Sequence, residues 1–218
     1  MAVVVACILI AWAIPLGDFA PVEPMPVVRG LVATIRPDPQ LEKHTCGFNA
    51  ISTIYRSYGL DPVERRLRDR LGVDQAAWFY DSETVGSIQP DIYRVLAQDG
   101  FEIVSPDMAK PASIQKLKDH LAGGLYALAL VQRRQNGNMH WVVLTGTKGD
   151  SLRICDSVEK DLYEEPNDDF VGRCVLSVTL LKPAETVTQP SVWRMHYQGV
   201  QDALRAFKRV RTPPPGSK

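Results

Sequence analysis

The hydrophobic pattern of this chain changes at two adjacent glycines, Gly123 and Gly124. Before them, apolar residues recur at helical spacing, and we expect helices at residues 45–58, 62–71, 90–98 and 113–121. After them come short runs of branched and aromatic residues, which are typical of strands. We expect these strands at 125–131, 140–146, 151–156 and 174–181, with one earlier strand at 101–105. Helices followed by strands predict an α+β fold, in which a helical half packs on one antiparallel sheet.

Length and charge limit the kind of protein this can be. The chain has 218 residues, 45% of them hydrophobic, which is enough for one domain with a full core. Its 25 basic and 25 acidic side chains cancel, so its net charge does not attract nucleic acid. The four cysteines are too scattered for a zinc site or a disulfide scaffold. We expect no nucleic-acid partner, no metal and no cofactor, and the oligomeric state stays open.

The N-terminal segment is uncharged and nearly all apolar from residue 2 to residue 16. This length is typical of a signal-peptide core and short for a bilayer span. No Lys or Arg precedes it, so a buried part of the fold is the alternative. We interpret residues 1–20 as a signal-like or anchor segment, with a membrane tether through residues 1–16. An exported or anchored location is therefore favoured over a cytoplasmic one.

The remaining boundaries follow from proline content and composition. Six prolines between residues 15 and 39 exclude a long helix, so residues 21–39 read as an extended linker. The folded domain is expected at residues 40–190. The segment 191–218 should hold an amphipathic helix near residues 200–210 and a disordered end.

Cys46 is expected in the first turn of a helix, with Thr45 as its N-cap. A thiol is a good nucleophile only as the thiolate, and the N-terminus of a helix favours negative charge. A buried structural cysteine is the alternative interpretation. Cys46 alone therefore does not decide between the two. A bridge between Cys155 and Cys174 also stays open, because sequence does not give their separation.

His140 and Asp156 are expected to meet at one edge of the sheet. His140 opens an apolar strand, and Asp156 ends the next strand of the same hairpin. An antiparallel hairpin returns the chain to the edge from which it started. A carboxylate beside an imidazole can fix its tautomer and stabilise the imidazolium. Trp141, the next residue along the strand, should point to the opposite face and belong to the core.

Gln40 precedes Cys46 by six residues, which is close enough for its amide to reach the space beside the thiol. An amide N–H from Gln40, together with the backbone N–H of Cys46, would form an oxyanion hole. Gln40, Cys46, His140 and Asp156 are therefore the candidate catalytic residues.

These residues lie in segments that resemble a known family. The segment QLEKHTCGFNAISTIYRSYGL, from residue 40, resembles the glutamine-and-cysteine block of the bacteriocin-leader, or double-glycine, peptidases, family thirty-nine of the papain-like cysteine peptidases. HWVVLTGTKGDSLRICD, residues 140–156, resembles their histidine strand and aspartate hairpin. TVGSIQPDIYRVLAQDGFEIV, residues 84–104, resembles the intervening helix and strand. The resemblance implies a papain-like fold and a peptide substrate, with the four residues in the roles already described.

Two departures from the family are visible. The family usually has proline after the aspartate, where this chain has Ser157, and no transporter follows the peptidase part, so we expect a stand-alone domain. The expected activity is hydrolysis of a peptide or amide bond through a Cys-His-Asp triad and an acyl-enzyme. An acyltransferase or transpeptidase using the same triad is one alternative, and a catalytically silent peptide-binding domain is another.

Overall fold

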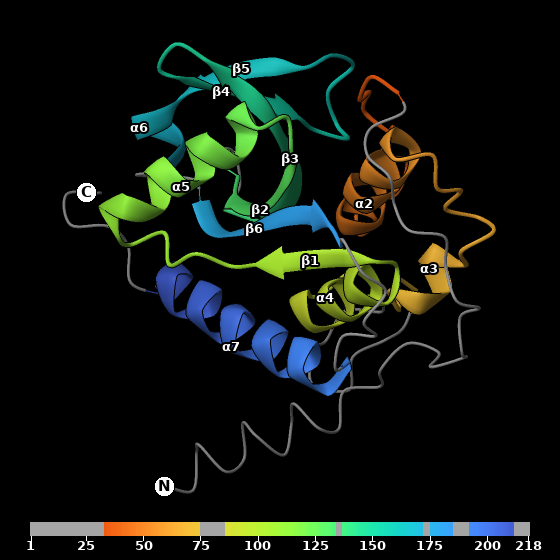
Figure 1. The fold of residues 1–218 in the computed structure, drawn as a ribbon. Helices are drawn as coiled ribbons and strands as arrows, with labels where there is room; N and C mark the ends of the chain where they lie inside the picture. The colour runs from red at the N-terminus through yellow and green to blue at the C-terminus, as the bar shows by residue number, and fades with distance from the viewer. Residues whose placement is uncertain (1–32, 75–85, 134–136, 172–174, 185–191, 212–218) are drawn as a thin grey trace, which may run out of the picture.

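The computed structural model describes residues 33–74, 86–133, 137–171, 175–184 and 192–211 (Figure 1). Its strands are β1 (Phe101–Val104), β2 (Ala127–Gln132), β3 (Met139–Lys148), β4 (Ser151–Cys155), β5 (Tyr163–Pro166) and β6 (Val175–Pro183). They form one antiparallel sheet in the order β1-β6-β2-β3-β4-β5. The expected antiparallel neighbours β2, β3 and β4 are present, and the unexpected strand β5 follows β4 at the edge. The last expected strand, β6, crosses back to lie between β1 and β2.

The helices lie on both faces of this sheet. They are α2 (Cys46–Ser57), α3 (Leu67–Arg70), α4 (Gln89–Gln98), α5 (Pro111–Ala122), α6 (Asn167–Asp169) and α7 (Val192–Arg211). The larger core cluster joins α2, α3, α4 and Ala206 of α7 to one face, and the second cluster joins α5 to the other. The α+β class is confirmed, but α5 covers the face that a single helical half would have left bare.

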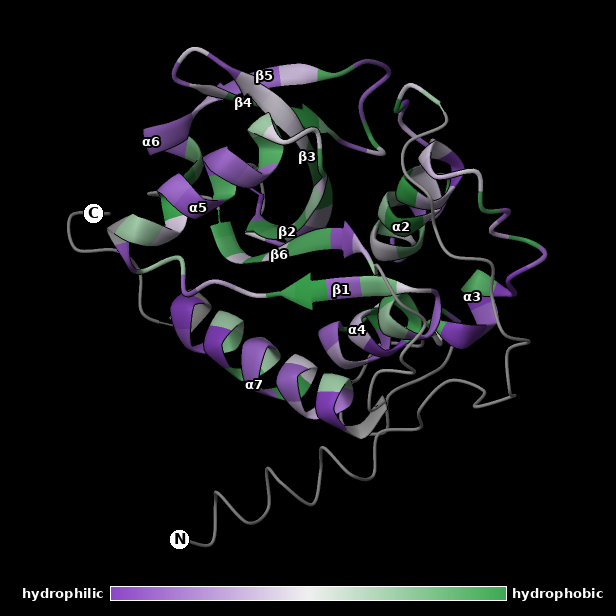
Figure 2. Cartoon of the chain, viewed as in Figure 1, coloured by the Kyte–Doolittle hydropathy of each residue, from purple (hydrophilic) through white to green (hydrophobic). Residues whose placement is uncertain are grey.

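Alternating side chains of each central strand feed the two clusters. Leu128, Leu130 and Val143 belong to the α2 face, whereas Ala129 and Val142 belong to the α5 face. Successive strand residues point to opposite faces, so a strand buried on both sides has to be apolar throughout. Figure 2 shows this composition as the green of the central strands, against the purple side of α7. The expected core position of Trp141 is confirmed, because it is 3% exposed within the α2 cluster.

Two segments extend the folded domain beyond the expected boundaries. Ile35 is 5% exposed in the α2-face core, and the backbone N–H of Asp38 donates to Thr53 Oγ1 at 3.0 Å. Residues 33–39 therefore pack on α2 rather than forming a linker. At the other end, α7 starts eight residues before the expected helix and packs closely on α4. A Cβ on Gly199 would come within 2.5 Å of the Pro90 Cα.

The expected helix at residues 62–71 is reduced to the single turn of α3. Arg66, its N-cap, has φ +48°, a left-handed conformation that interrupts a helix. A buried ion pair fixes this turn instead: Arg70 bonds Asp99 through both guanidinium nitrogens, at 2.9 and 3.0 Å. The Tyr55 hydroxyl donates to the same carboxylate. One buried carboxylate thus joins α2 and α3 to the end of α4.

The N-terminal segment lies outside the described residues, as do residues 21–32 of the expected linker and residues 212–218 of the expected disordered end. Within the described ranges, no helix is both long and apolar enough to cross a membrane.

Candidate active site

Cys46 is the first residue of α2 and is half-buried. Thr45 is the N-cap residue, as expected from the sequence, but its hydroxyl donates to the Glu42 carbonyl at 3.0 Å and does not cap the helix. No acidic side chain lies in the first turn. The positive end of the helix dipole at Cys46 is therefore not offset by a carboxylate of its own helix.

Close packing beside Cys46 brings α2 against the histidine strand. A Cβ on Gly47 would lie 2.6 Å from Ser87 Cβ and 3.0 Å from Trp141 Cδ1. The Trp141 indole N–H donates to the Ser87 carbonyl at 3.0 Å. Gly47 follows Cys46 in the chain, and Trp141 follows His140. Their contact therefore holds the backbones of the two candidate site residues near each other.

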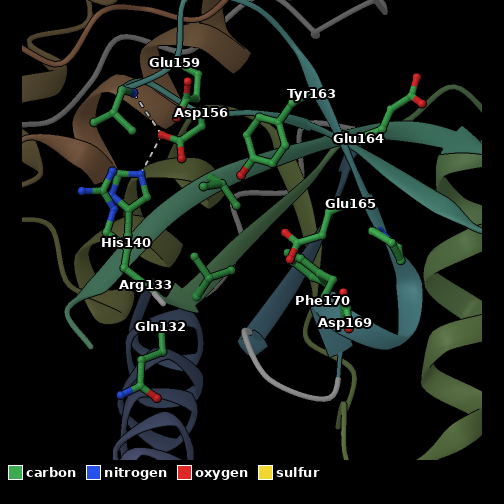
Figure 3. A pocket seen from close by; sticks show the side chains of 14 residues that line it. Gln132, Arg133, His140, Asp156, Glu159, Tyr163, Glu164, Glu165, Asp169 and Phe170 are labelled. Carbon is green, nitrogen blue, oxygen red and sulfur yellow. Dashed lines mark hydrogen bonds and ion pairs between the residues drawn. The ribbon is translucent and has the colours of Figure 1, made fainter. Parts of the chain in front are cut away.

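His140 and Asp156 are joined by a hydrogen bond. The Nε2 atom of His140 lies 2.7 Å from Asp156 Oδ1, and both side chains are buried. The Val158 N–H donates to the same carboxylate oxygen at 3.0 Å. The carboxylate is thus held from two sides, as Figure 3 shows with dashed lines. Because Nε2 is engaged by Asp156, Nδ1 is the imidazole nitrogen left for Cys46.

A register shift decides which face Asp156 occupies. The β3–β4 hairpin turns at Gly149 and pairs Lys148 with Ser151, and regular pairing from there would place Asp156 opposite Val143. Val143 belongs to the α2 face, the wrong side for His140. An extra residue between Leu144 and Gly146 shifts the register by one, so Asp156 falls on the face of His140.

The pKa of the His140 imidazole lies above its ordinary value. Burial lowers its pKa, but hydrogen bonds with Asp156 and Cys46, and the negative charges of both, outweigh burial and raise the pKa to about 9. A cation held between a carboxylate and a thiol is the arrangement in which a thiolate–imidazolium pair forms. The structure therefore brings Cys46, His140 and Asp156 together.

Gln40 reaches this group through the residue that follows Asp156. Its backbone N–H donates to the Ser157 carbonyl at 2.8 Å, and its side-chain Oε1 accepts from the Ser157 hydroxyl at 3.2 Å. Its Nε2 donates to the carbonyls of Glu42 and Lys43, at 2.8 and 3.0 Å. The amide therefore lies over the loop that leads to Cys46. Sequence reasoning had treated Ser157 only as a departure from the family pattern.

A cavity of about 650 Å³ opens beside the histidine and the aspartate. Val131, Val142 and Phe170 form part of its apolar lining, and Glu159 and Glu165 add carboxylates (Figure 3). Part of its wall comes from β5 and α6, which form within the segment after Asp156 that had no expected secondary structure.

One cluster among the described residues has the composition of a cation site. Single ligand atoms of Glu42, His44 and Asp74 lie within 4.8 Å of one another. However, the Arg68 guanidinium already bonds Glu42 at 2.8 Å and Asp74 at 2.7 Å. Its hydrogen bond lowers the pKa of Asp74 to about 2. A surface ion-pair network, with arginine as its cation, explains this cluster.

The second described cysteine is not a candidate nucleophile. Cys155 is buried and free, and burial together with the charge of Asp156 raises the pKa of its thiol to about 12. Its strand, β4, is separated from β6 by β2 and β3. Cys174, the partner considered for a disulfide, lies outside the described residues.

The solved structures that are similar to this chain include the following two. One is a double glycine motif protease from an AMS/PCAT transporter in complex with the leader peptide. It is 24% identical, with 73% of this chain and 98% of that chain covered and a TM-score of 0.50. The other is the peptidase domain of Streptococcus ComA, a bi-functional ABC transporter involved in a quorum sensing pathway. It is 18% identical, with 69% and 99% covered and a TM-score of 0.51.

No family model and no curated protein matches the chain. Both similar structures are covered almost completely, so the likeness extends over a whole domain and not over one motif. At these identities it concerns the fold. The chain has the papain-like α+β fold of the double-glycine peptidase domains.

Proposed function

We propose that this chain is a cysteine peptidase in which Cys46 is the nucleophile, His140 the acid and base, and Asp156 the residue that orients the imidazole. The observation that carries the proposal is the buried His140 imidazole, which is hydrogen-bonded to the Asp156 carboxylate at 2.7 Å and whose pKa is raised to about 9 by Asp156 and Cys46. A histidine with a purely structural role does not require the negative charge of Asp156 or of Cys46. A nucleophilic thiolate needs a nearby cation.

The reaction follows from the resting ion pair. The Cys46 sulfur attacks the carbonyl carbon of the scissile amide, and the π electrons move onto the oxygen. When the C–N bond breaks, the His140 imidazolium gives its proton to the leaving amine, and an acyl-enzyme remains. The neutral imidazole then takes a proton from water, whose oxygen attacks the thioester carbon. Release of the carboxylic acid restores the thiolate–imidazolium pair.

Gln40 and the Cys46 backbone N–H are proposed to stabilise the oxyanion. The Gln40 amide nitrogen carries two protons, which point to the carbonyls of Glu42 and Lys43 in the absence of substrate. Binding of an oxyanion requires one of these bonds to be exchanged for a bond to the charged oxygen. That exchange is favourable because a hydrogen bond to an ion is stronger than one between neutral groups.

The cavity beside the site fits a peptide substrate. His140 and Asp156 line it, and Cys46 does not. Because His140 protonates the leaving amine, the cavity lies on the side of the residues that follow the scissile bond. Its apolar lining can bury a side chain from that part of the peptide. One structural neighbour is a double-glycine-motif protease solved with its leader peptide, so Gly-Gly before the cleaved bond is the first sequence to test.

Hydrolysis of fluorogenic peptides with Gly-Gly before the reporter amide tests this function. We expect release of the reporter amine by the wild-type chain and none by Cys46→Ala. Added hydroxylamine separates the alternatives, because an acyltransferase would give only the hydroxamate. If wild type and Cys46→Ala bind the peptide equally and neither cleaves it, the chain is a binding domain.

A further inference from the structure

We propose that Ser157 is a positioning residue that fixes the Gln40 amide for oxyanion binding, an inference that rests on the proposed peptidase function. It follows Asp156 directly, so two consecutive residues would orient the two ends of the site. Asp156 orients the base, and Ser157 orients the oxyanion donor.

The contacts of Ser157 are specific to Gln40. Its carbonyl accepts from the Gln40 backbone N–H at 2.8 Å, and its hydroxyl donates to Gln40 Oε1 at 3.2 Å. Ser157 is 7% exposed, so this hydroxyl is largely removed from water. A buried hydroxyl without a partner is unfavourable, and Gln40 is the partner that this one has.

The hydroxyl matters most when substrate arrives. In the free chain, three hydrogen bonds hold the amide: two from Nε2 to the loop carbonyls and one to Oε1 from Ser157. Donation to an oxyanion exchanges at least one Nε2 bond. The Ser157 bond engages the other end of the amide, so it persists through the exchange. It therefore keeps the nitrogen directed at the reacting carbonyl while its partners change.

Ser157 lies in the same backbone turn as Asp156. Val158 and Glu159 donate their N–H groups to Asp156, to Oδ1 and to the carbonyl respectively. Ser157 is therefore enclosed in a turn that Asp156 itself closes.

The experiment compares four variants with the wild type: Ser157→Ala, Ser157→Thr, Gln40→Ala and the double variant Ser157→Ala/Gln40→Ala. Steady-state hydrolysis of the Gly-Gly reporter peptide gives kcat and KM for each. Alkylation of Cys46 by iodoacetamide is measured in parallel. The alkylation reaction forms no oxyanion, so its rate reports the thiolate–imidazolium pair alone.

We expect Ser157→Ala to lower kcat about threefold to tenfold, the effect of one neutral hydrogen bond, with KM and the alkylation rate unchanged. Ser157→Thr, which keeps the hydroxyl, should retain kcat. Gln40→Ala should lower kcat by about 10²- to 10³-fold, and the double variant should be no slower than Gln40→Ala alone. Ser57→Ala is the matched control, because it removes a buried hydroxyl from the far end of α2.

Three results would overturn the proposal: an unchanged kcat in Ser157→Ala, an equal loss in Ser157→Thr, or a further loss when Ser157→Ala is added to Gln40→Ala. Failure of the peptidase function is a different result, namely no cleavage by the wild type or undiminished cleavage by Cys46→Ala. The two failures are therefore distinguishable.

Discussion

Asp156→Asn removes one negative charge from the site while keeping an oxygen that can accept from His140. The pKa of His140 is about 9, against an ordinary value of 6.5. That rise corresponds to roughly 3 kcal/mol in favour of the imidazolium. Burial is the largest single effect and lowers the pKa, and only Cys46 is left to oppose it in Asp156→Asn, so we expect the pKa of His140 to fall to about 6.5. At pH 7.5 the protonated fraction then drops by about tenfold.

NMR titration of the His140 Cε1–H signal measures this directly, with the signal assigned by its loss in His140→Ala. The rate of Cys46 alkylation at pH 7.5 should fall at least about tenfold in Asp156→Asn, in step with the protonated fraction. Glu159→Gln, which removes a nearby exposed carboxylate, should leave the midpoint unchanged. A His140 midpoint that stays near 9 in Asp156→Asn would refute the assignment of Asp156.

Three further predictions concern stability and packing. Folding raises the pKa of His140, so the stabilisation from its protonated form is complete below pH 6.5 and is lost as the pH rises to about 9. The free energy of unfolding, measured by urea titration, should therefore decrease by about 3 kcal/mol over that window. The variant His140→Gln should not show this decrease. Gly47→Ala should lower the free energy of unfolding by about 1–3 kcal/mol and slow the alkylation of Cys46, because the added Cβ forces α2 away from Trp141. Unchanged stability and an unchanged alkylation rate would contradict this. Arg70→Met leaves the buried Asp99 carboxylate without its arginine, and should lower the free energy of unfolding, measured by thermal unfolding, by about 3–5 kcal/mol. Arg68→Met at the surface should lower it by under about 1 kcal/mol.

Elements with a strong local signal were predictable from the sequence. The buried parts of β2 (127–131) and β3 (141–144) are apolar throughout, as burial on both faces requires. The helix α4 starts at Gln89, one residue before the expected Pro90. His140 and Asp156 were expected at one edge, because a hairpin fixes that geometry. Their hydrogen bond lies where this reasoning placed it.

Features that depend on tertiary contacts were not predictable in the same way. The residue added near Leu144 moves Asp156 to the correct face, yet a one-residue register shift has no compositional signal. The missing helix at residues 62–71 has helical spacing, but the buried pair of Arg70 and Asp99 holds a single turn instead. Ser157 contacts Gln40 across 117 residues, a pairing that local pattern does not reveal.

The most direct test of the central claim is the mass of the chain during turnover. A Gly-Gly peptide ester reporter is mixed with the protein, the reaction is quenched in acid, and the intact mass and digest are measured. We predict a mass increase equal to the acyl part of the reporter, localised to Cys46 and absent from Cys46→Ala. Turnover without any adduct on Cys46, or with an adduct on another residue, would contradict the account.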